Sequence, residues 1–423
     1  MNTFKTIKLS NGATVLTIPM KNTSTTTVIL LFGAGSRYET PNIAGSSHLF
    51  EHLLFKGTKK RPTPKAIAEV IESKGGILNA YTDRESTGYW CKVPAGLYQK
   101  GIEVLIDMAK EPLLRKRDLE MEKNVVYEEI KAYLDSPDSR ASNKADENLW
   151  PNQPMGMDIA GSIDTVKATS RSDLVKFLNK QYTASNAVLV VSGNLDESKV
   201  KITAEKCFEG FREGKPKKFK DVNFNNSGPI VVFDKMETNQ AHITIALEGL
   251  AIRDENKYAS TILSVILGGG MTSRLFEQVR EKRGLAYSVS ATSHPYSDCG
   301  VFYIDAGVAP KNVEKTIQVI SDEIKGMRKD LSNQEIKDAK DLIKGRMMMQ
   351  FEDSRAVAMN YGLQYLLTRE IEPFEKIMNN IDQITLNDIE IVFDFIFKNS
   401  SAVVSIAGAT DEIPNFSKNF TLF

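Results

Sequence analysis

The chain has 423 residues, of which 41% are hydrophobic and 26% charged, a composition typical of a globular protein with two or more domains. Lysine plus arginine and aspartate plus glutamate number 54 each, so no net charge favours nucleic acid or an anionic membrane surface. These values exclude fibrous, disordered and strongly basic classes, and any partner must be recognised by a local site.

The amino-terminal segment predicts a strand that runs into an Asn11-Gly12 turn, with no signal peptide and no arginine-rich presequence. No run of about 18 apolar residues occurs, so we expect no membrane-spanning helix. The three cysteines, Cys91, Cys207 and Cys299, are scattered and odd in number. Such a pattern indicates a reducing compartment, and we expect a cytoplasmic protein.

The segment from Gly45 to Gly57 predicts one short helix. Ser46 or Ser47 could serve as its N-cap, and Gly57 stands where a left-handed residue is favoured after a helix. The helix would carry two of the four histidines of the chain.

His48 and His52 are four residues apart, so both imidazoles lie on one face of a helix and can reach one metal ion. Glu51 points beside them. The order His-x-x-Glu-His is the inverse of the better-known zinc-peptidase motif. This spacing predicts a zinc site with a carboxylate next to the ion.

A zinc site needs a third protein ligand, and the predicted helix Asp118–Leu134 is rich in glutamate. Two stripes compete for its inner face: Met121, Val125, Glu128 and Ala132, or Glu122, Val126, Glu129 and Tyr133. The second stripe places two carboxylates on one face, where one could bind a metal and the other orient the site. Periodicity alone leaves both Glu128 and Glu129 as candidates.

The chain contains an internal repeat. Ala187–Gly193 resembles Ala402–Gly408 at an offset of 215 residues, and Thr27–Gly33 matches Ile243–Gly249 at an offset of 216. We therefore predict an α+β fold with two homologous domains from internal duplication, each a mixed β-sheet packed by helices on one face.

The composition predicts the domain boundaries. A zinc-binding domain would span residues 1–213, a basic and turn-rich linker residues 214–228, and a homologous domain without metal ligands residues 229–423. In the second domain, the segment equivalent to the histidine motif is Ser264–Gly268, which is apolar and contains no ligand. The fold thus needs no histidine at this place, which favours a functional role for His48 and His52.

Taken together, these motifs resemble the family of inverted zinc peptidases that includes pitrilysin, insulin-degrading enzyme and mitochondrial processing peptidase. The resemblance is carried by Gly33–Glu39, by Gly45–Gly57, and by Glu122 followed by Val125–Ile130. It continues into the second half and covers nearly the whole chain.

The resemblance implies one zinc ion per chain, held by His48, His52 and Glu129. In the family the third ligand is the later member of a glutamate pair seven residues apart, which selects Glu129, with Glu122 as a supporting partner and Glu128 as the fallback.

The family also suggests the remaining parts of an active site. Glu51 would be the general base for a zinc-bound water. Arg280 and Tyr287, seven residues apart, would hold the substrate carbonyl or the developing oxyanion.

A glycine-led segment with Gly76, Asn79, Ala80 and Tyr81 resembles the family's edge strand, to which a peptide adds as another strand. The implied activity is that of a zinc-dependent endopeptidase acting on short or unfolded peptides, in peptide degradation or presequence-like processing.

Because one chain carries both the zinc half and the Arg-Tyr half, a homodimer with active sites completed across subunits is expected. The alternatives are a non-catalytic structural subunit and a peptide-binding module of the same fold.

Overall fold

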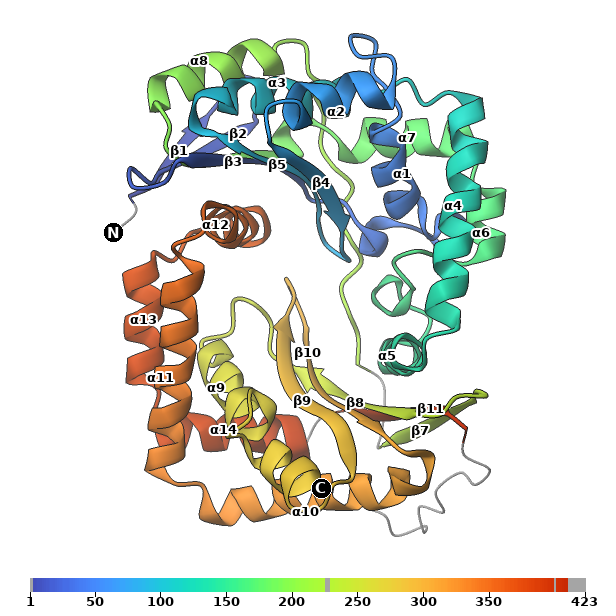
Figure 1. Cartoon of the computed structure of the whole chain (residues 1–423), viewed down its shortest axis with the longest axis vertical. Coiled ribbons are helices and arrows are strands. Elements are labelled where there is room, and N and C mark those ends of the chain that lie inside the picture. Colours follow the sequence, from blue (N-terminus) through green and yellow to red (C-terminus); the bar gives the residue numbers. More distant parts are fainter. Residues whose placement is uncertain (1–2, 225–228, 399–400, 410–423) are drawn as a thin grey trace. The chain divides into compact units, whose positions relative to one another are not determined.

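The structure, a computed structural model, describes residues 3–224, 229–398 and 401–409, and its strands form two mixed β-sheets (Figure 1). Residues 225–228 of the expected linker lie outside the described residues. The chain forms two compact units, each built on one sheet. Unit 1 comprises Met1–Ile130, Met157–Lys220 and Met348–Glu372, and unit 2 comprises Lys131–Gly156, Asp221–Met347 and Pro373–Phe423.

The sheet of unit 1 has the strand order β1-β2-β6-β3-β5-β4. Its strands are β1 (Lys5–Lys8), β2 (Thr14–Pro19), β3 (Thr25–Phe32), β4 (Ile77–Thr82), β5 (Thr87–Pro94) and β6 (Ala187–Gly193). Strands β2 and β6 are parallel, and the other neighbours are antiparallel.

The sheet of unit 2 has the order β7-β11-β8-β10-β9. Its strands are β7 (Ile230–Lys235), β8 (Ala241–Gly249), β9 (Ala286–Pro295), β10 (Gly300–Val308) and β11 (Ala402–Gly408). The pair β7 and β11 is parallel and the others are antiparallel, so this sheet repeats the order β2-β6-β3-β5-β4 of unit 1. The predicted α+β class and mixed sheets are confirmed.

Most helices of unit 1 share one apolar core with one face of its sheet. They are α1 (Ser46–Leu54), α2 (Pro64–Glu72), α3 (Tyr98–Lys110), α4 (Lys116–Leu134), α6 (Ile163–Ala168), α7 (Arg171–Gln181) and α8 (Glu197–Phe208). Of these, α2, α3 and α8 lie over the strands in Figure 1. The last four residues of α4 are assigned to unit 2.

The opposite face of this sheet is also apolar. Side chains alternate along a strand, so Val28 and Leu30 of β3 contact the helices above, whereas Ile29 and Leu31 point the other way. This second face is covered by α12 (Ser354–Thr368), which comes from the carboxyl-terminal half of the chain.

Unit 2 repeats this arrangement. One face of its sheet packs against α9 (Lys257–Gly268), α10 (Val313–Asp330), α11 (Asn333–Gln350), α13 (Phe374–Gln383) and α14 (Leu386–Lys398). The other face, including Ala246 and Val403, is covered by α5 (Pro137–Leu149) from the amino-terminal half. A single sheet face per domain was expected to carry helices, but both faces do, because the strands are apolar on both sides.

The compact units therefore differ from the expected boundaries of residues 1–213 and 229–423. Residues 131–156 join unit 2 and residues 348–372 join unit 1, so each half of the repeat contributes one helix to the sheet of the other half. Helical periodicity identifies an apolar face but not the sheet that this face covers, and the sequence pattern could not reveal the exchange.

The first part of the expected linker, up to Lys220, belongs to unit 1. Its described part, residues 214–224, forms no helix or strand. The Lys217 amide donates to Gln181 Oε1 at 2.7 Å, and the Arg37 guanidinium lies 3.9 Å from the ring centre of Phe219. Within the described ranges, no helix is long and apolar enough to span a bilayer.

The packing of α12 on the sheet can be tested at Gly362. A β-carbon at this position would lie 2.7 Å from Leu31 Cδ1 and 2.8 Å from Val190 Cγ2. We expect Gly362→Ala to lower the free energy of unfolding by about 1–2 kcal/mol, because overpacking outweighs a gain of about 1 kcal/mol in helix propensity. Urea denaturation measures the change.

The matched control is Gly345→Ala in α11, where a β-carbon would meet no described heavy atom within 4 Å. This variant should be more stable than the wild type by up to about 1 kcal/mol. Equal effects of the two substitutions would contradict the close packing of α12.

Candidate metal centre

Helix α1 begins differently from the prediction. Its N-cap is Gly45, in a left-handed conformation with φ 88°, and neither Ser46 nor Ser47 caps it. Instead the buried Glu39 carboxylate accepts hydrogen bonds from the amides of Gly45, at 2.7 Å, and Ser47. A side chain at residue 45 would collide with Ala160 O, 2.3 Å from a built β-carbon, so only glycine fits this turn.

The carboxyl group of Glu39 thus supplies acceptors for two amides that have no partner inside the helix. Burial raises the pKa of Glu39 to about 8, although the hydrogen bonds from Ser47 and Gly45 oppose the shift. The helix ends at Leu54. Gly57 has φ 137°, and a β-carbon there would lie 2.7 Å from Pro62 O, so the predicted need for glycine at this position is confirmed.

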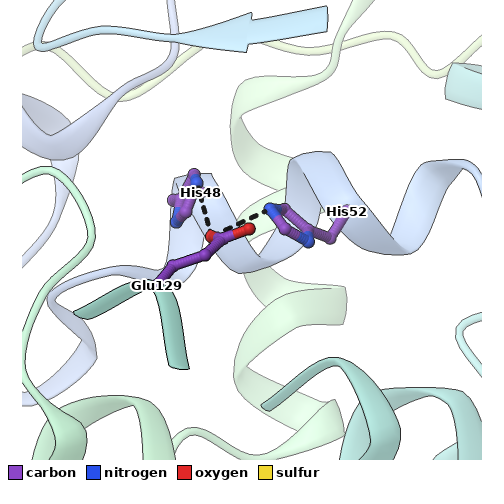
Figure 2. A group of neighbouring side chains, drawn as sticks. All are labelled: His48, His52 and Glu129. Carbon is purple, nitrogen blue, oxygen red and sulfur yellow. Dashed lines mark ion pairs between the residues drawn. The ribbon is translucent and has the colours of Figure 1, made fainter. Parts of the chain in front are cut away.

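Two imidazoles on α1 and one carboxylate on α4 converge (Figure 2). Glu129 Oε2 lies 3.6 Å from Nε2 of His48 and 3.6 Å from Nε2 of His52. One potential ligand atom from each residue lies within 4.8 Å of the others, and the described residues contain no other group of this kind with three members. The spacing of the histidines was visible in the sequence, and the fold adds the carboxylate.

The structure decides between the two stripes of α4. Val126 and Glu122 are buried, whereas Met121 and Val125 are 53% and 43% exposed. The stripe that contains Glu129 therefore faces α1, and Glu128 is exposed. Glu129 is the candidate third ligand.

His48 is well suited to bind a cation as a neutral imidazole. Burial, together with the nearby His52, lowers its pKa to about 4. Its Nδ1 is buried without a hydrogen-bond partner among the described residues, and so is Glu129 Oε2. Buried polar atoms without partners are rare in native proteins and indicate a missing ion or water.

Glu122 orients the ring of His52, because its Oε2 lies 3.3 Å from Nδ1 of that ring. Burial lowers the pKa of His52, but the hydrogen bond to Glu122 and the nearby carboxylates outweigh burial, and the net shift is upward. Burial raises the pKa of Glu122, but hydrogen bonds from His52 and Lys56 outweigh it, and that pKa is lowered. Sequence patterns did not identify Lys56, because its partner lies on another helix.

Glu51 lies on α1 beside the two histidines, and its Oε2 accepts a hydrogen bond from the hydroxyl of Thr82, the last residue of β4. Burial raises the pKa of Glu51, although the Thr82 hydrogen bond partly opposes the shift. A carboxylate with a raised pKa is a better proton acceptor near neutral pH. Thr82 was not predicted, because its role depends on the position of β4 next to α1.

Strand β4 is an edge strand that pairs only with β5 in the described sheet. Gly76 directly precedes it, and the Ala80 amide donates to Asn79 Oδ1 at 2.8 Å. Tyr81 is partly buried, with its hydroxyl 3.4 Å from Ser86 Oγ. The predicted substrate residues therefore share one sheet edge that ends at Thr82, the partner of Glu51.

Arg280 and Tyr287 lie in unit 2, whereas the three candidate ligands lie in unit 1. Arg280 is exposed in the π-helical segment Phe276–Glu281, with its guanidinium 4.8 Å from the ring centre of Phe276. Tyr287 is 60% exposed on the edge strand β9. The candidate metal centre of unit 1 thus contains neither residue.

Comparisons with known proteins agree with these features. Residues 14–162 match the insulinase family (peptidase family M16), and residues 168–343 match the peptidase M16 inactive domain. An uncharacterized zinc protease of Rickettsia bellii is 33% identical over 406 residues, which covers 96% of this chain and 97% of that protein.

Two solved structures have a similar fold. A protease from Helicobacter pylori has a TM-score of 0.88 at 22% identity. The match covers 96% of this chain and 99% of that protein. A peptidase M16 inactive domain from Pseudomonas fluorescens has a TM-score of 0.88 at 20% identity. The match covers 96% of this chain and 98% of that protein.

The ligand assignment can be tested with the pair Glu129→Gln and Glu128→Gln. Removal of the Glu129 carboxylate should weaken zinc binding by at least about 100-fold, more than the loss typical of a residue that only supports a ligand. The exposed Glu128 should be dispensable. Zinc dissociation constants from competition with a chromophoric chelator provide the comparison, and tighter binding by the Glu129 variant than by the Glu128 variant would reverse the assignment.

Proposed function

The chain belongs to the M16 peptidase family, and from this premise we propose that it is a zinc-dependent endopeptidase that hydrolyses short or unfolded peptides. The observation that carries the proposal is the convergence of His48, His52 and Glu129 next to the carboxylate of Glu51. The physiological role would be peptide degradation or presequence-like processing.

The residues of the centre fit one zinc ion per chain. Two imidazole nitrogens and one carboxylate oxygen form a ligand set found in catalytic zinc sites, which keep a fourth position open. The unpartnered, buried Glu129 Oε2 is an atom that a cation would satisfy. When bound, zinc would polarise the peptide carbonyl and lower the pKa of a water molecule.

Glu51 would act as the general base. Its carboxylate would accept a proton from the attacking water and later donate that proton to the leaving amine. The hydrogen bond from Thr82 holds one carboxylate oxygen, Oε2, and so orients the group. The raised pKa of Glu51 suits a residue that must both accept and release a proton.

The free edge of β4 would bind the peptide as an additional strand. Strand addition uses main-chain hydrogen bonds, so it tolerates many sequences and requires an extended segment that folded proteins do not offer. The contact between Thr82 and Glu51 would join the end of this edge to the general base. Gly76, Asn79, Ala80 and Tyr81 would line the binding strand.

Arg280 and Tyr287 would stabilise the negative charge that develops on the carbonyl oxygen, since a guanidinium and a phenol are strong hydrogen-bond donors. We propose that they act on the zinc centre of a second copy of the chain in a homodimer. Their exposure leaves both side chains available to a partner molecule.

The alternative is a non-catalytic structural or peptide-binding subunit, because one solved neighbour is named an inactive domain. The complete set of His48, Glu51, His52 and Glu129 favours the enzyme. For the location we propose the cytoplasm, because the thiols of Cys91 and Cys207 are free, as expected in a reducing compartment.

The general base is tested by Glu51→Gln. Hydrolysis of an unstructured peptide should fall by about 10²–10⁴-fold, because the amide cannot accept the proton, while zinc remains bound. Rates would be measured by mass spectrometry of the products, and zinc content on the same sample. The exposed Glu128→Gln serves as control and should keep wild-type activity.

A chelator should abolish the wild-type activity, and added zinc should restore it. Unchanged hydrolysis by Glu51→Gln would refute the role of Glu51. A wild-type protein that binds zinc and peptide but never cleaves would support the non-catalytic alternative.

The cross-subunit site is tested by mixing two inactive variants, Glu51→Gln and Tyr287→Phe. If each active site takes Glu51 from one chain and Tyr287 from the other, half of the randomly mixed dimers contain one intact site. The mixture should then recover about a quarter of the wild-type rate. No recovery after exchange of subunits, or a strictly monomeric active enzyme, would exclude the shared site.

A further inference from the structure

Lys56 is a charged residue at the metal centre that the zinc motif does not include. It follows the end of α1, where its amide donates to Leu53 O at 3.1 Å. Its Nζ lies 2.6 Å from Oε1 of Glu122, whose side chain is only 5% exposed. This contact differs from an ordinary surface ion pair, because the carboxylate partner is buried and its charge needs compensation.

The ion pair occupies one of the two oxygens of Glu122. The other oxygen, Oε2, faces Nδ1 of His52 at 3.3 Å. With Oε1 bound to Lys56, the carboxylate is held at both ends, and Nδ1 must act as the hydrogen-bond donor of the ring. The lone pair of the imidazole is then on Nε2, the atom that lies 3.6 Å from Glu129 Oε2.

A second contact fixes the main chain of Lys56. Arg115, directly before α4, donates from Nη2 to Lys56 O at 2.8 Å and from Nη1 to Pro62 O at 3.0 Å. Its Nε donates to Asp118 in the first turn of α4. Lys56 is thus tied to α4 through both its carbonyl and its ammonium group, and α4 is the helix that carries Glu129.

We propose that Lys56 is a positioning residue of the metal centre: its ion pair with Glu122 orients His52 so that Nε2 faces the ion, and it fixes the end of α1 against α4. The inference rests on the proposed zinc centre but requires no catalytic activity.

The test compares zinc affinities of the full-length chain. Lys56→Met should weaken zinc binding by about 10-fold, the lower end of the loss caused by residues that support a ligand. Lys56→Arg keeps the charge and should recover most of the affinity. The control is Lys59→Met, which removes an exposed lysine paired with Glu111 at 2.8 Å and should leave the affinity unchanged.

A double-mutant cycle shows whether Lys56 acts through Glu122. In the Glu122→Gln background, Lys56→Met should have little further effect on zinc affinity, because the carboxylate that it orients is gone. Additive effects of the two substitutions would overturn the proposed path, and wild-type affinity of Lys56→Met would overturn the role of Lys56 itself.

Two further measurements separate this role from general stability and from the proposed function. The visible spectrum of bound Co²⁺ should change in Lys56→Met if His52 is misplaced, and an unchanged spectrum would contradict the proposal. If Lys56→Met does not fold, Lys56→Gln, which lacks the charge but keeps a hydrogen-bond donor, takes its place in the cycle. If the wild type does not cleave peptides, the proposed endopeptidase activity is refuted. The zinc affinities of the variants would still test the positioning role of Lys56.

Discussion

The apolar character of both sheet faces is the constraint on which the rest of the structure depends. Strands β6 and β11 are buried along their whole length, so each sheet must be covered on two sides. Each half of the chain places most of its helices on one face only. The remaining faces are covered by α12 and α5, each from the other half, and this exchange makes the two homologous halves interdependent.

The candidate metal centre combines residues of two helices that belong to the same apolar core of unit 1. Helix α1 supplies both histidines, and α4 supplies Glu129 and Glu122. Two carboxyl groups near the centre are bound by donors: Glu122 by Lys56, and Glu39 by the amides of Gly45 and Ser47. Two buried atoms of the centre, Nδ1 of His48 and Oε2 of Glu129, have no hydrogen-bond partner among the described residues. Glu129 Oε2 is also the atom that lies 3.6 Å from Nε2 of both histidines, as expected where a cation binds.

Although the fold is repeated, the described residues contain one candidate metal centre, in unit 1. Apart from the additional strand β1 in unit 1, both sheets have the same strand order, and β4 and β9 are the equivalent edges. In unit 2 the segment equivalent to His48–His52 is the apolar end of α9, and the exposed Arg280 and Tyr287 accompany the second edge instead. The two halves thus carry different side chains on one fold: the candidate ligands in the first, and the exposed Arg280 and Tyr287 in the second.

The sequence by itself determined the local features: the mixed sheets, the repeat, and the His48-x-x-Glu51-His52 order, because these depend on periodicity and short spacing along the chain. Spacing could not choose between Glu128 and Glu129, since both stripes of α4 are helical and only packing against the core of unit 1 buries one of them. The fold alone decided the capping of α1 by Glu39, the contact of Thr82 with Glu51, and the exchange of α5 and α12. Each of these joins residues far apart in the chain, whose proximity is set by packing and not by any local pattern.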